Sequence, residues 1–170
     1  SFTAETSDGL GAQLRYRFAA DGALELRFRP NAPAVQAVST AWSSPAAQRY
    51  FGGGQRFSGF ELRGGSLPLW ISHGPRSNRA TSTNEIAASF FWCPCGWGAW
   101  APSDARGEIN FAERAEHDDA VRLMQEADAL EVVLYRGTPR EILSAHTARA
   151  GRPQWTPPDW MWPRVVRSAW

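Results

Sequence analysis

Apolar and charged residues alternate along the first part of the chain. Residues 14–29, LRYRFAADGALELRFR, contain two alternating runs on either side of Asp21-Gly22. The apolar residues that share a face are Leu14, Tyr16 and Phe18 before this pair, and Leu24, Leu26 and Phe28 after it. An Asp-Gly pair between alternating segments is typical of a β-hairpin. The pattern therefore predicts a hairpin here.

The same kind of pattern predicts further short strands. IAASFFWCPCGWGAWAPS, residues 86–103, indicates a strand, a turn at Gly96–Gly98 and a second strand. Three more strands are predicted at 107–112, 120–127 and 129–137. A meandering connection is expected over the Pro-, Ala- and Ser-rich residues 30–48, and a long polar loop over 73–85. Many short strands with long loops predict an all-β fold, a sandwich of antiparallel sheets.

One helix is specified near the end of the chain. Thr138 can act as N-cap, with Pro139 at the first helical position and Glu141 at the third, which makes a capping box. Gly151 supplies a C-terminal stop. The sequence therefore predicts a helix over residues 139–150, with Ile142, Ala145, His146 and Arg149 along one stripe.

Residues 49–70, RYFGGGQRFSGFELRGGSLPLW, combine many glycines with aromatic residues. A dinucleotide-binding fingerprint needs a helix after the glycines, and none is predicted. A phosphate-binding P-loop needs a lysine, and the chain has only arginine as its basic residue besides histidine. A flexible linker would not repeat aromatic residues. We therefore expect a structural strand and turn, in which glycine permits positive φ and close backbone approach.

Net charge, apolar runs and aromatic content limit the classes of function that we expect for the chain. The formal net charge is +1, which gives no reason to expect nucleic acid or an anionic membrane as a partner. No apolar run is long enough to span a bilayer. Nine Trp and nine Phe suit a β-rich core, and they also suit stacking on sugar rings.

The two cysteines, Cys93 and Cys95, are expected on one face of an extended strand, where they cannot easily bridge. We predict buried free thiols, and no second Cys pair or His cluster completes a metal site. Free thiols favour a reducing compartment, so the cytoplasm is favoured while the location stays open. The chain begins at Ser1 and stops at Trp170 within an apolar run, and we expect both ends to be cut from a longer protein.

Three segments resemble motifs of family 31 glycoside hydrolases, in the same order. Residues 49–70 look like the family's Y-G-x-G-E-x-F segment with its following turn and Trp-containing strand, although Gln55 replaces the usual Glu. TSTNEIAASFFWCPCGWGAWAPS, residues 81–103, is similar to the family's T-S-T segment with two strands. YRGTPREILSAHTARAGRPQWTPPDW, residues 135–160, resembles the G-x-T-P…G-R-P…P-P-x-W segment that joins the β-domain to the catalytic barrel.

The resemblance implies a galactose-mutarotase-like β-supersandwich over residues 1–152, followed at 153–170 by a linker and the first strand of a (β/α)8 barrel. It also implies that the two catalytic aspartates of a retaining α-glycosidase, a nucleophile and an acid/base, lie further along the barrel. Neither position exists in this chain, so we expect the 170 residues alone to be inactive. The acidic residues Asp104, Asp118-Asp119 and Asp159 are interpreted as turn residues.

The resemblance also implies which residues of this chain reach the substrate pocket. The loop Ser72–Thr83 would cover the barrel mouth, with His73 where relatives often place a sugar-contacting Asp. Arg76 and Arg79 lie in the same loop and would suit an acidic or sulfonated sugar. Trp170 aligns with an aromatic residue that lines the pocket. The alternatives are a solvated loop and a barrel-core tryptophan.

Three hypotheses about function follow. The first is the N-terminal β-domain of a retaining glycosidase acting on an α-glucoside, an α-xyloside or a related sugar, with the missing barrel as its partner in cis. The second is a non-catalytic carbohydrate-binding β-sandwich, and the third is a remnant that binds only a partner domain. We expect no cofactor and no metal, a carbohydrate as ligand, and exposed apolar surface around Trp155, Trp160, Trp162 and Trp170. Homo-oligomerisation is left open.

Overall fold

The computed structural model describes residues 2–5, 11–31, 35–56, 59–70, 84–112 and 119–152. The strands are β1 (Phe2–Glu5), β2 (Gly11–Phe18), β3 (Leu24–Pro30), β4 (Val38–Ser43), β5 (Phe51–Arg56), β6 (Ser66–Pro68), β7 (Asn84–Cys93), β8 (Trp97–Trp100), β9 (Gly107–Phe111), β10 (Ala120–Gln125) and β11 (Leu130–Arg136). One helix, α1, covers Pro139–Ala150. Within these residues no helix has the length and apolar character needed to cross a membrane.

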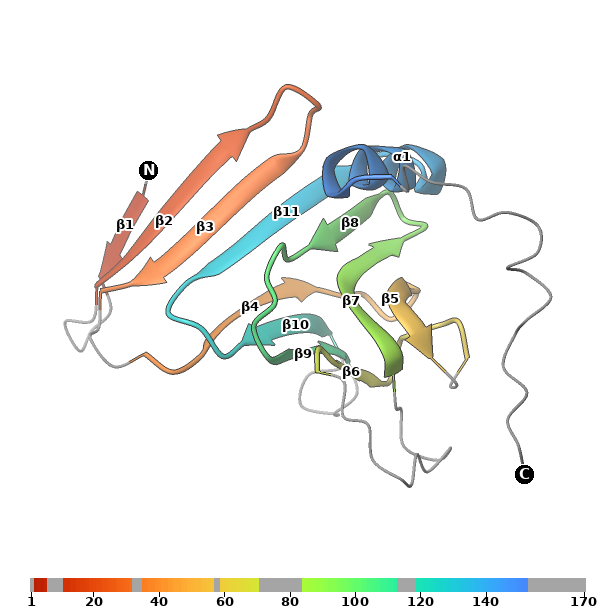
Figure 1. The fold of residues 1–170 in the computed structure, drawn as a ribbon, viewed down its shortest axis with the longest axis horizontal. Helices are drawn as coiled ribbons and strands as arrows, with labels where there is room; N and C mark the ends of the chain where they lie inside the picture. The colour runs from red at the N-terminus through yellow and green to blue at the C-terminus, as the bar shows by residue number, and fades with distance from the viewer. Residues whose placement is uncertain are drawn as a thin grey trace, which may run out of the picture.

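Two antiparallel sheets make up the fold (Figure 1). Seven strands form the larger sheet in the order β1-β2-β3-β11-β8-β7-β5, and four form the smaller one in the order β4-β10-β9-β6. In Figure 1 the β2–β3 hairpin extends beyond the smaller sheet, while α1 lies across the ends of β11 and β8. The predicted all-β sandwich with one late helix is confirmed.

The main core lies between the two sheets because both sheets alternate apolar and polar residues. On the smaller sheet, Leu67, Ile109 and Leu123 are paired in register and are buried together. On the larger sheet, the residues that face them include Phe91, Ala99, Leu130 and Val132. A second cluster fills the space beneath α1 and consists of Ala23, Phe90, Val133, Tyr135 and Ile142. The larger sheet is therefore apolar on both faces where α1 covers it.

The predicted hairpin is confirmed as β2 and β3. Asp21 accepts a hydrogen bond from the backbone N–H of Ala23 at 3.1 Å, and Gly22 has a φ of 80°. The tip of the hairpin has no smaller sheet beneath it, so Tyr16 and Phe18 remain 48% and 72% exposed. Apolar alternation thus predicted the pairing of the strands, but not the burial of every apolar residue.

The glycine-rich segment forms β5 and the turn before β6, as predicted. Gly52, Gly53 and Gly54 all have positive φ, and the register of β5 against β7 shifts between Gly52 and Gly54. A Cβ atom on Gly54 would overlap the carbonyl oxygen of Ile86 on the neighbouring strand. These positions need glycine for close backbone approach, not for ligand binding.

The connection predicted at 30–48 is wrong in part. Residues Val38–Ser43 form β4, which pairs with β10 at the edge of the smaller sheet. The turn predicted at Gly96–Gly98 lies at residues 94–96 instead, since Trp97 already begins β8. The predicted helix is confirmed over the same residues, with a complete capping box between Thr138 and Glu141.

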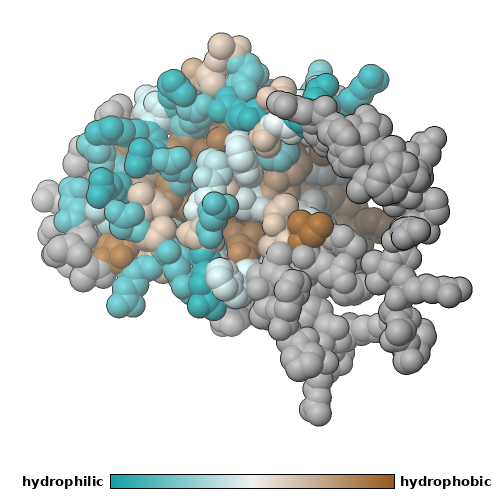
Figure 2. Space-filling view, viewed as in Figure 1, coloured by the Kyte–Doolittle hydropathy of each residue, from teal (hydrophilic) through white to brown (hydrophobic). Residues whose placement is uncertain are grey.

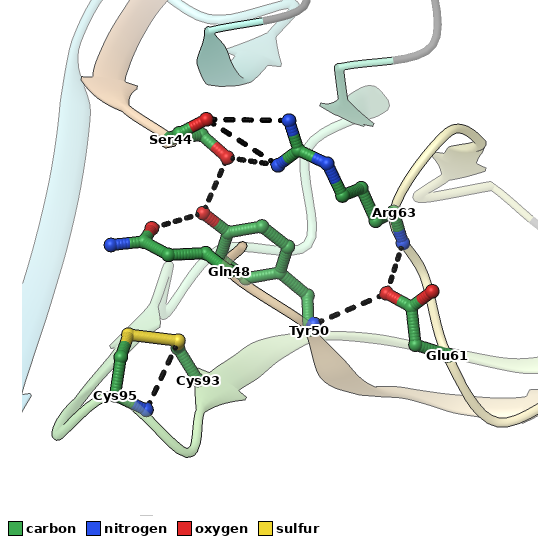
Figure 3. Close-up of a disulfide and its surroundings, with 7 residues drawn as sticks. All are labelled: Ser44, Gln48, Tyr50, Glu61, Arg63, Cys93 and Cys95. Atoms are coloured by element: carbon green, nitrogen blue, oxygen red, sulfur yellow. Dashed lines mark hydrogen bonds between the residues drawn. A yellow bond between two sulfur atoms is a disulfide. The ribbon is translucent and has the colours of Figure 1, made fainter. Parts of the chain in front are cut away.

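The prediction of free thiols is wrong, because Cys93 and Cys95 form a disulfide (Figure 3). Cys93 is the last residue of β7, and the chain turns over residues 94–96 before β8 begins. The two Cα atoms are therefore 5.1 Å apart, within disulfide range, instead of about 6.6 Å as on a continuous strand. The reasoning for a reducing compartment rested on free thiols and loses its basis.

Candidate functional site

The site residues predicted from the family resemblance lie outside the described residues. His73, Arg76 and Arg79 belong to the segment 71–83, and Trp170 belongs to 153–170. The same C-terminal segment contains the predicted apolar surface around Trp155, Trp160 and Trp162. It also contains the predicted second domain. These residues therefore remain predictions.

One groove, of about 610 Å³, lies along the outer face of the larger sheet at the end of α1. Its walls come from β7, from the end of β8 with the loop 101–104, from α1, and from the loop after β6. We call it the aromatic groove, because Trp70, Phe90, Trp100 and His146 line it. Clefts with aromatic walls and a few polar groups are typical small-molecule sites.

Trp70 is the most exposed aromatic residue of this groove, with 53% of its surface accessible. The guanidinium carbon of Arg106 lies 4.9 Å from the centre of the Trp70 ring, a cation–π contact. This contact holds the ring at the groove while leaving more than half of the side chain open. An exposed, held tryptophan is a suitable stacking surface for a sugar ring.

His146 also lines this groove, and its ring packs against the cluster beneath α1. Its ring stacks on Phe90 with 3.8 Å between the ring centres, and Trp100 meets it edge-on at 5.1 Å. Burial lowers the pKa of His146 below its ordinary value, so the ring is neutral at pH 7. Nδ1 lies 3.4 Å from the hydroxyl of Tyr135, whose pKa burial raises to about 12. His146 is thus a neutral packing and hydrogen-bonding group.

The chemistry available in the aromatic groove is that of binding. Asp104 is the single carboxylate among the described residues that line it, whereas glycoside hydrolysis needs a pair. Across the described part of the chain, no group of three His, Cys, Asp or Glu residues is placed to hold a metal ion. The groove can therefore hold a ligand, but its described residues supply no acid/base pair.

A second groove, of about 580 Å³, adjoins the first at Trp100 and Pro102, which line both. We call it the arginine groove, because Arg15, Arg17, Arg27 and Arg149 line it. Figure 2 shows hydrophilic residues gathered over the part of the molecule where β2, β3 and β11 lie. The outer face of the sheet thus carries an aromatic and a charged groove side by side.

Ion pairs fix the helix side of the arginine groove. Arg149 on α1 reaches Glu25 at 2.5 Å and Asp21 at 2.7 Å, and Arg17 donates to Glu25 at 2.6 Å. Hydrogen bonds from Arg149 lower the pKa of both carboxyls below their ordinary values, with Arg17 adding to the effect at Glu25. The hairpin and the helix are therefore held at a set distance across the groove.

Sequence reasoning missed a buried polar network beside the disulfide (Figure 3). The hydroxyl of Tyr50, fully buried, donates to Gln48 Oε1 at 2.6 Å and lies 2.7 Å from Ser44 Oγ. Arg63 in turn donates to Ser44 Oγ at 2.7 Å. This network ties the loop 44–50 to the turn before β6, and we assign it a structural role because its hydrogen bonds join these two backbone segments.

No family model and no curated protein matches the sequence. Solved structures do match. The family 31 sulfoquinovosidase from E. rectale, in complex with an aza-sugar inhibitor, superposes with a TM-score of 0.71 at 15% identity and covers 95% of this chain. The cycloalternan-forming enzyme from Listeria monocytogenes, in complex with a pentasaccharide substrate, gives 0.67 at 16% identity over 92% of this chain.

A family 31 dextranase from Flavobacterium johnsoniae, complexed with isomaltotriose, gives a TM-score of 0.61 at 16% identity over 86% of this chain. The match spans only 27%, 17% and 20% of the lengths of these three enzymes, respectively. The resemblance predicted from the three motifs is confirmed for the fold, since the dextranase and the sulfoquinovosidase are enzymes of that family. The chain therefore has the fold of a β-sandwich domain that forms part of family 31 glycoside hydrolases.

Proposed function

We propose that this chain is the β-domain of a retaining glycosidase that hydrolyses α-linked sugars, such as α-glucosides or α-xylosides. The proposal rests on the structural match, which covers most of this chain but only a small part of each matching enzyme. It covers 86% to 95% of this chain, but only 17% to 27% of three carbohydrate-active enzymes. Order and content of the three sequence motifs support the same assignment.

In this proposal the domain supports a catalytic barrel and shapes the entrance to its pocket. The catalytic aspartates belong to the barrel in this proposal. His73, Arg76, Arg79 and Trp170 are the residues we propose to reach the substrate. The domain has the galactose-mutarotase-like arrangement that the motifs imply.

A second candidate function is a carbohydrate-binding module without its own catalyst. The aromatic groove favours it, because Trp70 is half exposed and is held in place by Arg106. The two functions differ in whether a barrel is encoded with this domain. They agree that the ligand is a carbohydrate, which is the class bound by the matching enzymes.

The test is to express the product of the complete gene and the 170-residue chain, and to assay both with aryl α-glucoside and aryl α-xyloside. We expect the complete product to release the aryl group and the 170-residue chain to release none. Turnover by the 170-residue chain alone would overturn the assignment of catalysis to a barrel. If neither protein reacts but the chain binds α-gluco-oligosaccharides in calorimetry, the binding-module function replaces the first.

A further inference from the structure

Two arginines face each other directly on the outer face of the β2–β3 hairpin. Arg15 on β2 is the register partner of Arg27 on β3, and Gln13 is the partner of Arg29. These four side chains enclose a pocket of about 130 Å³, which we call the arginine pocket. Like charges directly opposite in an antiparallel pair are destabilising, so an anion held between these arginines would stabilise the arrangement.

Nearby carboxylates offset the positive charge of Arg27 but not that of Arg15. Glu131 lies 3.2 Å from Arg27, and Asp128 lies 3.2 Å from Arg29, both on the side of β11. Among the described residues, no carboxylate lies within ion-pair distance of Arg15. The guanidinium of Arg15 therefore faces a second guanidinium and has no carboxylate partner among the described residues. It is placed to bind an oxyanion, because the planar guanidinium group binds such anions through two hydrogen bonds.

The arginine pocket adjoins the larger arginine groove, which has apolar side chains on its far side. Arg15 and Arg27 line both the arginine pocket and the arginine groove, whose far side is formed by Trp100 and Pro102. A ligand that extends from the arginines toward Trp100 would contact charged side chains at one end of the groove and an aromatic side chain at the other. An acidic sugar has this combination, with an anionic group on a ring whose C–H face packs on aromatic side chains.

We propose that the outer face of the larger sheet binds an acidic saccharide, with its carboxylate or sulfate group between Arg15 and Arg27 and its ring along the groove toward Trp100. Among the described residues of this face, Asp21, Glu25, Asp128 and Glu131 argue against a long polyanion, because a nucleic acid lying along the sheet would also meet these negative charges. This site goes beyond the proposed function, and it is measured on the 170-residue chain without any hydrolysis assay.

The experiment compares methyl α-D-glucuronide with methyl α-D-glucoside, which differ only in the charged group. Binding is followed by two-dimensional NMR of the 170-residue chain, through the arginine Nε–H and tryptophan indole signals. We expect the glucuronide to bind at least about tenfold more tightly than the glucoside, a difference that one charge-assisted contact can supply. The signals of Arg15, Arg27 and Trp100 should all move.

Arg15→Gln should weaken glucuronide binding by about tenfold or more. The same variant should melt at a higher temperature than the parent without ligand, because it removes a like-charge pair. Arg122→Gln is the matched control, since Arg122 is an exposed arginine on β10 of the other sheet. It should leave binding unchanged.

Two further probes separate the sources of the anion. Sodium sulfate should bind more weakly than the glucuronide and leave Trp100 unmoved. Equal affinity for both with no change at Trp100 would mean an adventitious ion only, and would overturn the saccharide site. Tighter binding of a hexaglutamate peptide than of the glucuronide would overturn it in favour of a protein partner.

Discussion

Arg149 on α1 and Glu25 on β3 lie 124 positions apart in the chain, yet Nη1 of the arginine is 2.5 Å from Oε1 of the carboxylate. The same guanidinium also binds Asp21 at the turn of the hairpin. One side chain thus joins the C-terminal helix to the N-terminal hairpin. It also forms one wall of the arginine groove.

Arg149→Ala should therefore destabilise the fold by roughly 1 kcal/mol, a value discounted for partial exposure of the pair. Urea denaturation followed by tryptophan fluorescence measures the effect. Arg140→Ala is the control on the same helix, because Arg140 is exposed. An equal loss in both variants would show that the ion pairs contribute nothing specific.

The same contact predicts a pH dependence. Asp21 and Glu25 have lowered pKa values because Arg149 binds their charged forms. Their contribution to stability is present above their unfolded pKa values and is lost as pH falls through the lower folded values. The parent should lose stability below about pH 4.5, and Arg149→Ala should lose less over the same range. Parallel acid profiles would contradict this.

His146 gives a second pH-dependent effect, of the same sign but at higher pH. Burial against Phe90 lowers its pKa below 6.5, so protonation favours the unfolded chain. Stability from this residue is complete above pH 6.5 and falls as pH drops below it. His146→Phe should remove that slope below about pH 6.5. An NMR titration that gives an ordinary pKa for His146 would refute the prediction.

Gly54 should be the glycine of β5 that tolerates substitution least. Gly54→Ala forces a Cβ onto the carbonyl of Ile86 in a positive-φ conformation, and should cost about 2–4 kcal/mol of unfolding free energy. Gly64→Ala is the control, because Gly64 also has positive φ but open space around it. It should cost about 1 kcal/mol. Equal values from thermal melts would mean that the close approach is unimportant.

Gln125 is fully buried at the end of β10, and neither atom of its amide has a hydrogen-bond partner among the described residues. Gln125→Met keeps the volume and removes an unpaired polar group, so it should raise stability by about 1–2 kcal/mol. Gln36→Met, at an exposed position, should be neutral. A destabilised Gln125→Met protein would indicate that the amide is satisfied by bound water.

Much of the fold could be predicted from the sequence because its signals are local. The hairpin at Asp21-Gly22 and the capping box at Thr138 each lie within a few residues. The strand β4 was missed because a polar residue, Thr40, stands between Val38 and Trp42 on the inner face and blurs the alternation. The disulfide was missed because it depends on where the chain turns after Cys93.

The grooves could not be predicted, because they join segments that the sequence separates. Trp70, Trp100 and His146 come from a loop, a strand and a helix, and the sequence gives each of them only a local role. The pairing of Arg15 with Arg27 was implicit in the predicted hairpin, yet its significance depends on the acidic residues of a distant strand. The residues predicted from the family resemblance stay predictions.

We propose that this β-domain belongs to a retaining α-glycosidase. The most direct test is proton NMR of the first sugar released when the product of the complete gene acts on an aryl α-glucoside or an aryl α-xyloside. We expect the α-anomer to appear first and the β-anomer only later, through mutarotation. Initial release of the β-anomer would show an inverting enzyme and contradict this assignment.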